Sequence, residues 1–293
     1  HGHAAISDSA TAPLEMTPTD AGSEETGVRA AAVPAAAAGR PGGAKFLTGS
    51  LMRHVAVMTL TSSIGLLALF VVDFVNLFFI SRLGDPALTA GIGFASTLLF
   101  LNSSLNIGLM ITISALAARR IGMGRAETTR ALLGEVLLLG IVLSAIIATI
   151  FWTFAPQWVD LMGGSGTAKD AAVSYIRIVA PFGPVTVTGM VCSGLLRAYG
   201  DARRAMNTTL AMAIGNAVFD PLLIFGLGWG FVGAAWSTVI SIMLMAITGV
   251  VPILRHYGGF AMPSRESFSA NLTDIRKIMV PAVLTNLATP VGG

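Results

Sequence analysis

The chain contains six long stretches of predominantly apolar residues, separated by short polar segments. They run approximately over residues 55–81, 87–117, 132–155, 172–196, 205–228 and 231–254, and a seventh begins near residue 275. About 20 consecutive apolar residues are enough to cross the hydrocarbon core of a membrane as a helix. The pattern therefore predicts an all-α, polytopic helical membrane protein.

The composition agrees with a membrane protein. Only 11% of the 293 residues are charged and 54% are hydrophobic, whereas soluble domains carry about 25% charged residues. The single cysteine, Cys192, lies inside an apolar stretch, and we expect it to act as a small packing residue.

The first 45 residues differ from the rest of the chain. They are rich in Ala, Gly, Pro, Ser and Thr, which predicts a disordered tail, and they lack the pattern of a signal peptide. We interpret His1 and His3 as incidental rather than as metal ligands. Because the chain starts without methionine and stops inside an apolar stretch, we expect it to be a fragment.

The basic residues are distributed unevenly between the polar segments. Every second segment is basic, and these segments together hold 15 of the 18 Lys and Arg residues: Arg29, Arg40, Lys45, Arg53, Arg119, Arg120, Arg125, Arg130, Arg197, Arg203, Arg204, Arg255, Arg265, Arg276 and Lys277. Basic loops remain in the cytoplasm. The bias therefore predicts a cytoplasmic N-terminus.

Two carboxylates, Asp73 and Asp220, lie in the middle of apolar stretches, whereas the others after residue 46 lie in loops or near the ends. An ionisable residue at mid-span costs about 2.5–3.5 kcal/mol on insertion scales and usually faces the bundle interior, where it serves a function. At 1.5 Å per residue, Asp73 and Asp220 lie roughly 16 and 12 Å below the same membrane surface. We therefore expect them in one layer.

Other oxygen ligands are expected at the same level. Asn216 precedes Asp220 by four residues and shares its helix face, and Thr238 lies roughly 15 Å deep on the next stretch. Desolvation and a second carboxylate favour the protonated form of an acid, and oxygen ligands suit hard cations. The set predicts a proton or Na⁺ site; the alternative is that polar neighbours satisfy each acid and fix helix packing.

Prolines predict breaks in two of the helices. Pro221 removes a helix hydrogen bond directly beside Asp220, and a broken helix beside an ion-binding acid is a recurrent device in transporters. Pro181 and Pro184 predict a kink in the helix over 172–196.

The order and spacing of these motifs resemble the MATE (multidrug and toxic compound extrusion) family. The family's signature for helices four to six is matched by GLLRAYGDARRAMNTTLAMAIGNAVFDPLLIFGLGWGFVGAAWSTVIS, and further similarity lies in VDFVNLFFISRLGDPALTAGIG and ARRIGMGRAETTRA. The resemblance covers about residues 46–293. It is strongest to the DinF-like prokaryotic branch.

This resemblance implies a bundle of twelve helices in two six-helix lobes. Residues 46–258 would form the six-helix N-lobe, 259–274 a cytoplasmic loop between the lobes, and 275–293 the truncated start of the second lobe, with helix 7. The protein would be a multi-pass monomer in the cell's inner (plasma) membrane.

The resemblance also implies a function. Family members are antiporters that use H⁺ or Na⁺, with no other cofactor, to export amphiphilic and mostly cationic small molecules. The N-lobe cation site of the DinF-like branch is matched by Asp73, Asn216, Asp220 and Thr238, and an accessory tyrosine by Tyr175. Many members have a proline near the start of helix 1, but HVAVMTLTSSIGLLALFVVD has none; helix 7 carries the equivalent Pro281. This departure puts a bending mechanism for helix 1 in doubt.

Three other functions are alternatives to a cation-coupled antiporter. A flippase for lipid-linked oligosaccharides, from the same broader superfamily, would hold a pyrophosphate with basic residues, and this bundle has almost none at depth. A passive channel is the second alternative, and its flux would not depend on an ion gradient as the flux of an antiporter does. A membrane enzyme is disfavoured because metalloprotease, nucleophile-elbow and phosphate-loop motifs are absent. No nucleic-acid partner is expected.

Overall fold

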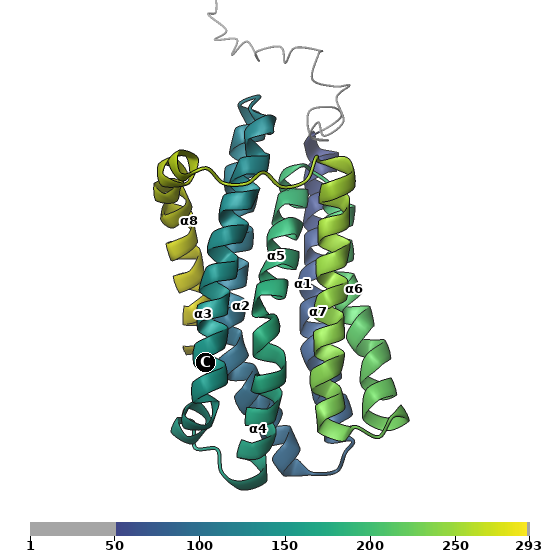
Figure 1. Ribbon diagram of the computed structural model, residues 1–293. Coiled ribbons are helices and arrows are strands. Elements are labelled where there is room, and N and C mark those ends of the chain that lie inside the picture. The colour runs from purple at the N-terminus through teal and green to yellow at the C-terminus, as the bar shows by residue number, and fades with distance from the viewer. Residues whose placement is uncertain (1–50, 292–293) are drawn as a thin grey trace, which may run out of the picture. The chain divides into compact units, whose positions relative to one another are not determined.

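A computed structural model describes residues 51–291 of the chain (Figure 1). The tail predicted over residues 1–45, with His1 and His3, lies outside the described residues. The elements, in chain order, are α1 (Leu51–Ser81), α2 (Pro86–Gly122), η3 (Ala126–Thr128), α3 (Thr129–Leu161), α4 (Gly166–Val179), η4 (Ala180–Phe182), α5 (Gly183–Ala198), α6 (Ala202–Pro221), η5 (Leu222–Gly226), α7 (Gly230–His256) and α8 (Arg265–Val291).

The predicted all-α membrane architecture is confirmed. Within residues 51–291, six helical segments are long and apolar enough to cross a membrane. Helix α1 exposes Leu67, Phe70 and Phe74 at 64%, 71% and 68% of their surface. A contiguous apolar face of this kind is rare on soluble monomers, whereas lipid tails or another membrane helix can cover it.

The helices begin and end close to the predicted positions, for local reasons. Asp85 caps α2 by accepting a hydrogen bond from the Ala87 N–H at 2.8 Å, and Pro86 stands at the first helical position, where its missing N–H costs nothing. The expected start of the last helix near residue 275 is wrong, because α8 already begins at Arg265. There the Ser264 hydroxyl accepts a hydrogen bond from the Ser267 N–H at 3.1 Å, as a helix cap does.

Three of the spans are interrupted. The predicted kink at Pro181 is a short 3₁₀ segment, η4, between α4 and α5, and the predicted break at Pro221 is a π-helical turn, η5. The third interruption was not predicted: Phe154 in α3 has non-helical angles (φ −100°, ψ 15°) two residues before Pro156. Helix α1, which lacks the family proline, is one uninterrupted helix.

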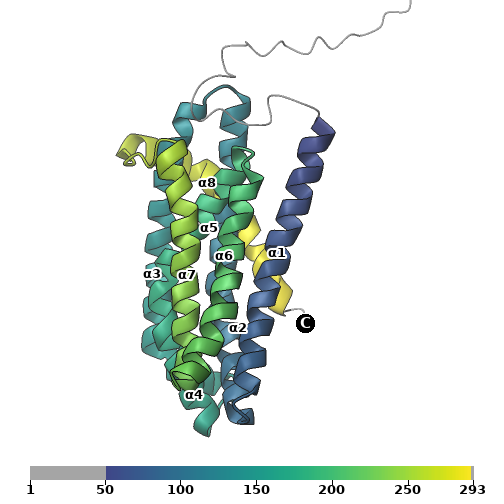
Figure 2. The same cartoon turned by 90° about the vertical axis from the view of Figure 1, so that its right-hand side faces the viewer.

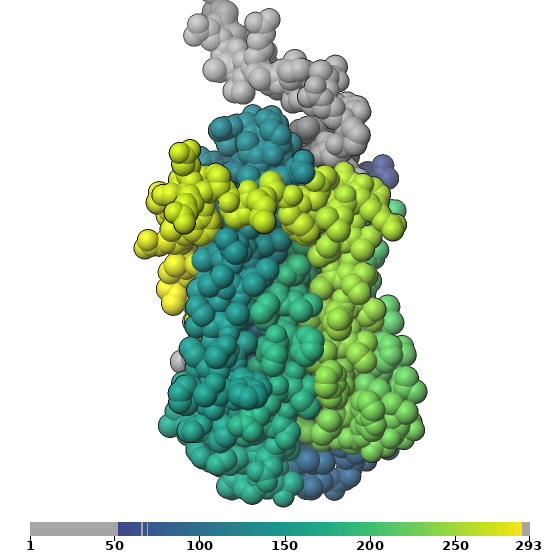
Figure 3. All heavy atoms as spheres, viewed as in Figure 1, coloured from purple at the N-terminus to yellow at the C-terminus, as the bar shows by residue number. Residues whose placement is uncertain are grey.

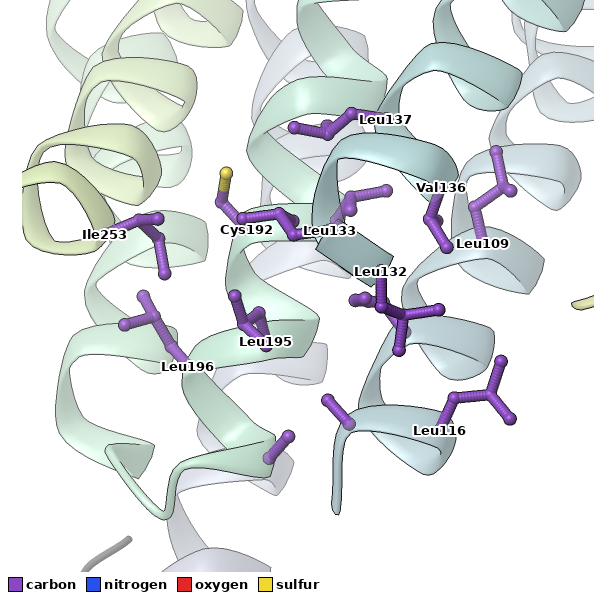
Figure 4. Packing of buried hydrophobic residues seen from close by; sticks show 14 of the residues in the cluster. Leu109, Leu116, Leu132, Leu133, Val136, Leu137, Cys192, Leu195, Leu196 and Ile253 are labelled. Atoms are coloured by element: carbon purple, nitrogen blue, oxygen red, sulfur yellow. The ribbon is translucent and has the colours of Figure 1, made fainter. Parts of the chain in front are cut away.

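The helices pack side by side around apolar clusters. Figure 4 shows one cluster, in which side chains of α2, α3, α5 and α7 meet. Cys192 is fully buried in this cluster, which confirms its predicted role in packing. Helix α6 lies between α1 and α7 and contacts both (Figure 2).

The two ends of the bundle are named here after Asp85, in the α1–α2 turn, and Asp201, in the α5–α6 turn. At the Asp85 end, lowest in Figure 1, the tight turns contain glycines with positive φ, Gly84 at 75° and Gly228 at 68°. Glycine adopts this conformation without a steric penalty. These turns join α1 to α2 and α6, through η5, to α7 as two helical hairpins.

At the Asp201 end, the segment from α7 to α8 crosses over the start of α3 (Figure 3). The Ala261 N–H donates to the Arg130 carbonyl at 3.3 Å. Beyond the crossing, Glu135 of α3 is fully buried, and it accepts hydrogen bonds from the Ser267 hydroxyl and, at 2.8 Å, from the Asn271 amide of α8. Asn271 in turn accepts from Arg120 of α2 at 2.6 Å, so polar contacts join α8 to α2 and α3.

One close helix approach that can be tested by mutation is at Gly194 of α5. A Cβ atom there would lie 2.5 Å from the Met110 carbonyl oxygen of α2 and 2.7 Å from an Ile113 methyl group. By contrast, a Cβ on Gly93 of α2 would meet nothing within 4 Å.

We predict that Gly194→Ala lowers the free energy of unfolding by about 1–3 kcal/mol, because the added methyl group overpacks a backbone contact. Gly93→Ala should leave stability unchanged or slightly raised, since alanine is the better helix former. The unfolding temperature of the purified protein in one detergent measures both. Equal effects of the two substitutions would contradict the packing assignment.

Candidate functional site

A cavity of about 400 Å³ opens between α1, α2, α4, α5, α6 and α7. Its walls combine apolar side chains, such as Leu77, Ile92 and Leu99, with hydroxyl and amide groups. Among the residues that line it, Asp73 is the only charged one. The volume is within the range of about 300–1,000 Å³ that is usual for small-molecule sites.

Asp73 lies on α1, where it is exposed and lines the cavity. Asn76 follows one helical turn later and lines the same cavity. Its side chain is only 7% exposed, and its Oδ1 atom makes no hydrogen bond to any described residue. Helix α1 thus presents a carboxylate and an amide oxygen on one face.

Asp220 and Asn216 lie one turn apart on α6, and both are completely buried. Asn216 Oδ1 is 3.5 Å from the Ser237 hydroxyl of α7, while its Nδ2 has no partner among the described residues. The Ser237 hydroxyl of α7 lies beside the Asp220 carboxylate, but neither carboxylate oxygen makes a hydrogen bond of ordinary geometry to a described residue. An isolated ionised carboxylate is very costly to bury, so this position is suited to sharing its charge with a proton or a cation.

Thr238 and Tyr175 join α7 to α4. Their hydroxyl oxygens are 2.8 Å apart, and both side chains line the cavity. The Thr238 hydroxyl also donates to the Ala234 carbonyl at 3.1 Å. Thr238 therefore accepts the hydrogen bond from Tyr175, and the Tyr175 ring packs against Phe231 with ring centroids 5.7 Å apart.

The structure brings the predicted residues together in two groups. Asp73, Thr238 and Tyr175 form part of the cavity wall, whereas Asn216 and Asp220 are buried on α6, which packs against α1 and α7. Of the two predicted acids, Asp73 therefore faces the cavity, whereas Asp220 is enclosed.

Pro221 ends α6 directly after Asp220. The Leu222 N–H donates a hydrogen bond to the carbonyl of Phe219, three residues earlier, instead of to the carbonyl four residues earlier. The Leu227 N–H donates to the Leu222 carbonyl, five residues earlier, at 2.9 Å, which is the π-helical pattern. Such π-helical turns often occur at functional sites. A helix that is already broken can change its geometry beside Asp220 with little loss of hydrogen bonding.

Sequence reasoning missed two amides of α2, Asn102 and Asn106, which line the same cavity. Asn102 accepts a hydrogen bond from Ser144 of α3 at 3.2 Å. Asn106 is fully buried, and neither its Oδ1 nor its Nδ2 has a partner among the described residues. The run LNSSLN at the middle of an otherwise apolar helix was a signal that could have found both.

The described residues contain no group of three or more His, Cys, Asp or Glu side chains placed to hold a metal ion. A cation at this site would depend on carboxylate, amide and hydroxyl oxygens, which are the ligands of hard ions such as Na⁺. Asp73, Asp220, Asn216 and Thr238 provide these donor types.

The chain is similar in sequence to known transporters. A model of the MatE family matches residues 61–222. The chain is 32% identical over 256 residues to a FAD transporter of Shewanella oneidensis, covering 84% of this chain and 55% of that protein. It is 25% identical over 240 residues to the multidrug export protein MepA of Staphylococcus aureus, covering 78% and 51%.

Solved structures show the same fold. A MOP superfamily transporter from Pyrococcus furiosus superposes with a TM-score of 0.77 at 25% identity, over 85% of this chain and 56% of that one. An outward-facing multidrug resistance transporter of the MATE family gives a TM-score of 0.75 at 25% identity, over 83% and 54%. The chain therefore spans little more than half the length of the relatives that it matches.

The Tyr175–Thr238 contact leads to a prediction about stability. Thr238→Val leaves the buried Tyr175 hydroxyl without an acceptor and should cost about 1–3 kcal/mol, whereas Tyr175→Phe removes only the donor and should cost about 0.5–1.5 kcal/mol. The double variant should be less destabilised than the sum of the two single variants. Reversible unfolding of the four proteins in mixed micelles measures this coupling, and strict additivity would argue against the hydrogen bond.

Proposed function

This chain belongs to the MatE family of transporters, and from that premise we propose that it works as a cation-coupled exporter of small organic molecules. In this proposal, a proton or Na⁺ enters the site around Asp220 while substrate leaves the cavity beside Asp73. The observation that carries the proposal is the Asp220 carboxylate, which is fully buried on α6 beside the Ser237 hydroxyl and has no salt-bridge partner among the described residues.

The coupling follows from the position of the two acids. Asp73 borders the cavity, and Asp220 lies on α6, which packs against α1. A cation shared by the two acids would alter the charge of the cavity wall and the packing of α1 against α6 and α7. Binding that favours one arrangement of these helices biases the protein towards one access state.

The substrates are proposed to be amphiphilic and neutral or cationic in the part that enters the cavity. This follows from its mixed apolar and polar wall and from Asp73 as the single charged lining residue. The named relatives are a FAD transporter and a multidrug export protein, so the shared lobe is compatible with more than one substrate class.

We further propose that the protein acts as a monomer in the inner (plasma) membrane. The Asp201 end of the bundle would face the cytoplasm, because the basic loops with Arg119, Arg125 and Arg203 belong to this end. Substrate would leave towards the Asp85 end. Alternating access between two lobes would carry it across.

The carboxylates can be tested by substitution in the full-length protein. Asp220→Asn and Asp73→Asn remove a titratable charge with little change of shape, and each should reduce drug efflux from cells to the level of cells that lack the protein. The control is Asp160→Asn, which changes a surface carboxylate paired with Lys169 and should leave efflux intact. Wild-type efflux in both site variants would refute the proposal.

The coupling ion can be identified with membrane vesicles. A proton gradient and a Na⁺ gradient, imposed separately, should differ in their ability to drive substrate uptake, and Asp220→Asn should abolish the response to the effective one. Substrate flux that is the same with and without either gradient would indicate a passive channel instead of an antiporter.

A further inference from the structure

The cavity wall has a cluster of side-chain amides that the proposed cation site does not use. Asn76 of α1 and Asn102 and Asn106 of α2 all line the cavity, and they are 7%, 9% and 0% exposed. Asn102 and Asn106 are four residues apart and thus share one face of α2. The cavity therefore has an amide-lined wall formed by two neighbouring helices.

Two of these amides have unused hydrogen-bonding capacity. Both polar atoms of Asn106 and the Oδ1 of Asn76 make no hydrogen bond to any described residue. Almost all buried polar groups in proteins have a partner, and a lost partner is costly because the group has already been desolvated. Amides that only fixed helix packing would be bonded within the protein, as Asn102 is to Ser144.

A carboxamide has a donor and an acceptor side by side in one plane. Its complement is a planar group with an adjacent acceptor and donor, and for this reason asparagine binds the edge of adenine with two hydrogen bonds. Lactam and imide edges of other heterocycles offer the same pattern. Aromatic side chains, Phe100 and Tyr175, also line the cavity, and such side chains stack with flat rings.

We propose that Asn106, assisted by Asn76, recognises the lactam or imide edge of a planar heteroaromatic substrate. This inference rests on the proposed function, because it names the substrate class of the exporter's cavity. No basic side chain lines the cavity within the described residues. The heterocycle therefore enters this cavity, and any phosphate groups of the same molecule are bound elsewhere.

The test uses two flavin rings that differ at one position. Lumiflavin has an imide N–H between two carbonyl groups, and 3-methyllumiflavin has a methyl group in place of that hydrogen. Binding to the full-length protein in nanodiscs is followed by quenching of flavin fluorescence, without any ion gradient. We expect lumiflavin to bind about tenfold more tightly than its methylated analogue, in keeping with one well-formed bidentate contact.

Variants assign this preference to the amide. Asn106→Leu should bind both flavins equally, whereas the control Asn207→Leu, the same change at an exposed position of α6, should keep the preference. Because Asn106 has no partner to lose, the unfolding temperature of ligand-free Asn106→Leu should not fall. If this variant does not fold, Asn106→Ser and Asn76→Leu test the same contact.

Several outcomes would overturn the proposal. They are equal binding of the two flavins by the unmodified protein, no binding of either, or a preference that survives in Asn106→Leu. Equal binding of the two flavins would indicate that the amides bind water in the cavity instead of the edge of a substrate. The assay needs no coupling cation, so a failure here is distinguishable from a failure of Asp73 and Asp220 to couple transport.

Discussion

Hydrocarbon provides no hydrogen-bonding partner, and this constraint governs every irregular feature of the bundle. A helix in lipid must satisfy its backbone groups internally, so that a break is tolerated only where protein or a water-filled cavity covers it. The breaks at Pro181 and Pro221 both follow this rule. The η4 segment packs on α3, and η5 packs on α7, where Gly233 approaches the Leu223 backbone so closely that a Cβ atom would lie 2.8 Å from it.

The same constraint applies to side chains and concentrates polarity in one region. Among the described residues, buried polar side-chain atoms without a partner belong to Asn76, Asn106, Asn216 and Asp220, with Trp158 as the exception. Two of these residues line the cavity, and the other two are neighbours on α6 beside the broken turn. Apart from Trp158, this unused hydrogen-bonding capacity lies where a ligand and a cation are proposed to bind.

This arrangement divides the proposed work between the helices. The α6 and α7 side holds Asp220, Asn216 and Thr238, which suit a proton or a small cation. The wall of α1 and α2 carries the amides, which suit an uncharged organic ring. Asp73 belongs to the cavity wall on α1, and α1 packs against α6, so the proposed exchange of substrate for cation would depend on this residue.

The sequence by itself predicted the helices, their approximate ends and the breaks at Pro181 and Pro221. The length of an apolar stretch and the positions of proline and glycine affect the backbone locally. Their effect on helices and turns in a membrane does not depend on how the helices pack. The sequence also singled out Asp73 and Asp220, because a charge at that depth is costly in any fold. The break at Phe154 and the start of α8 at Arg265 were missed, although Pro156 and Ser264 are local signals for them.

Only the tertiary structure decided how each polar side chain is used. Depth along a helix placed Asp73 and Asp220 in one layer but could not tell that one faces a cavity and the other is enclosed. It gave no reason to separate Asn106, which has no partner among the described residues, from Asn102, which is bonded to Ser144, or to expect Glu135 to join α3 to α8. These differences depend on how each helix is rotated about its axis and on which helices lie next to it. Contacts between residues that are distant in the chain determine both the rotation and the neighbours.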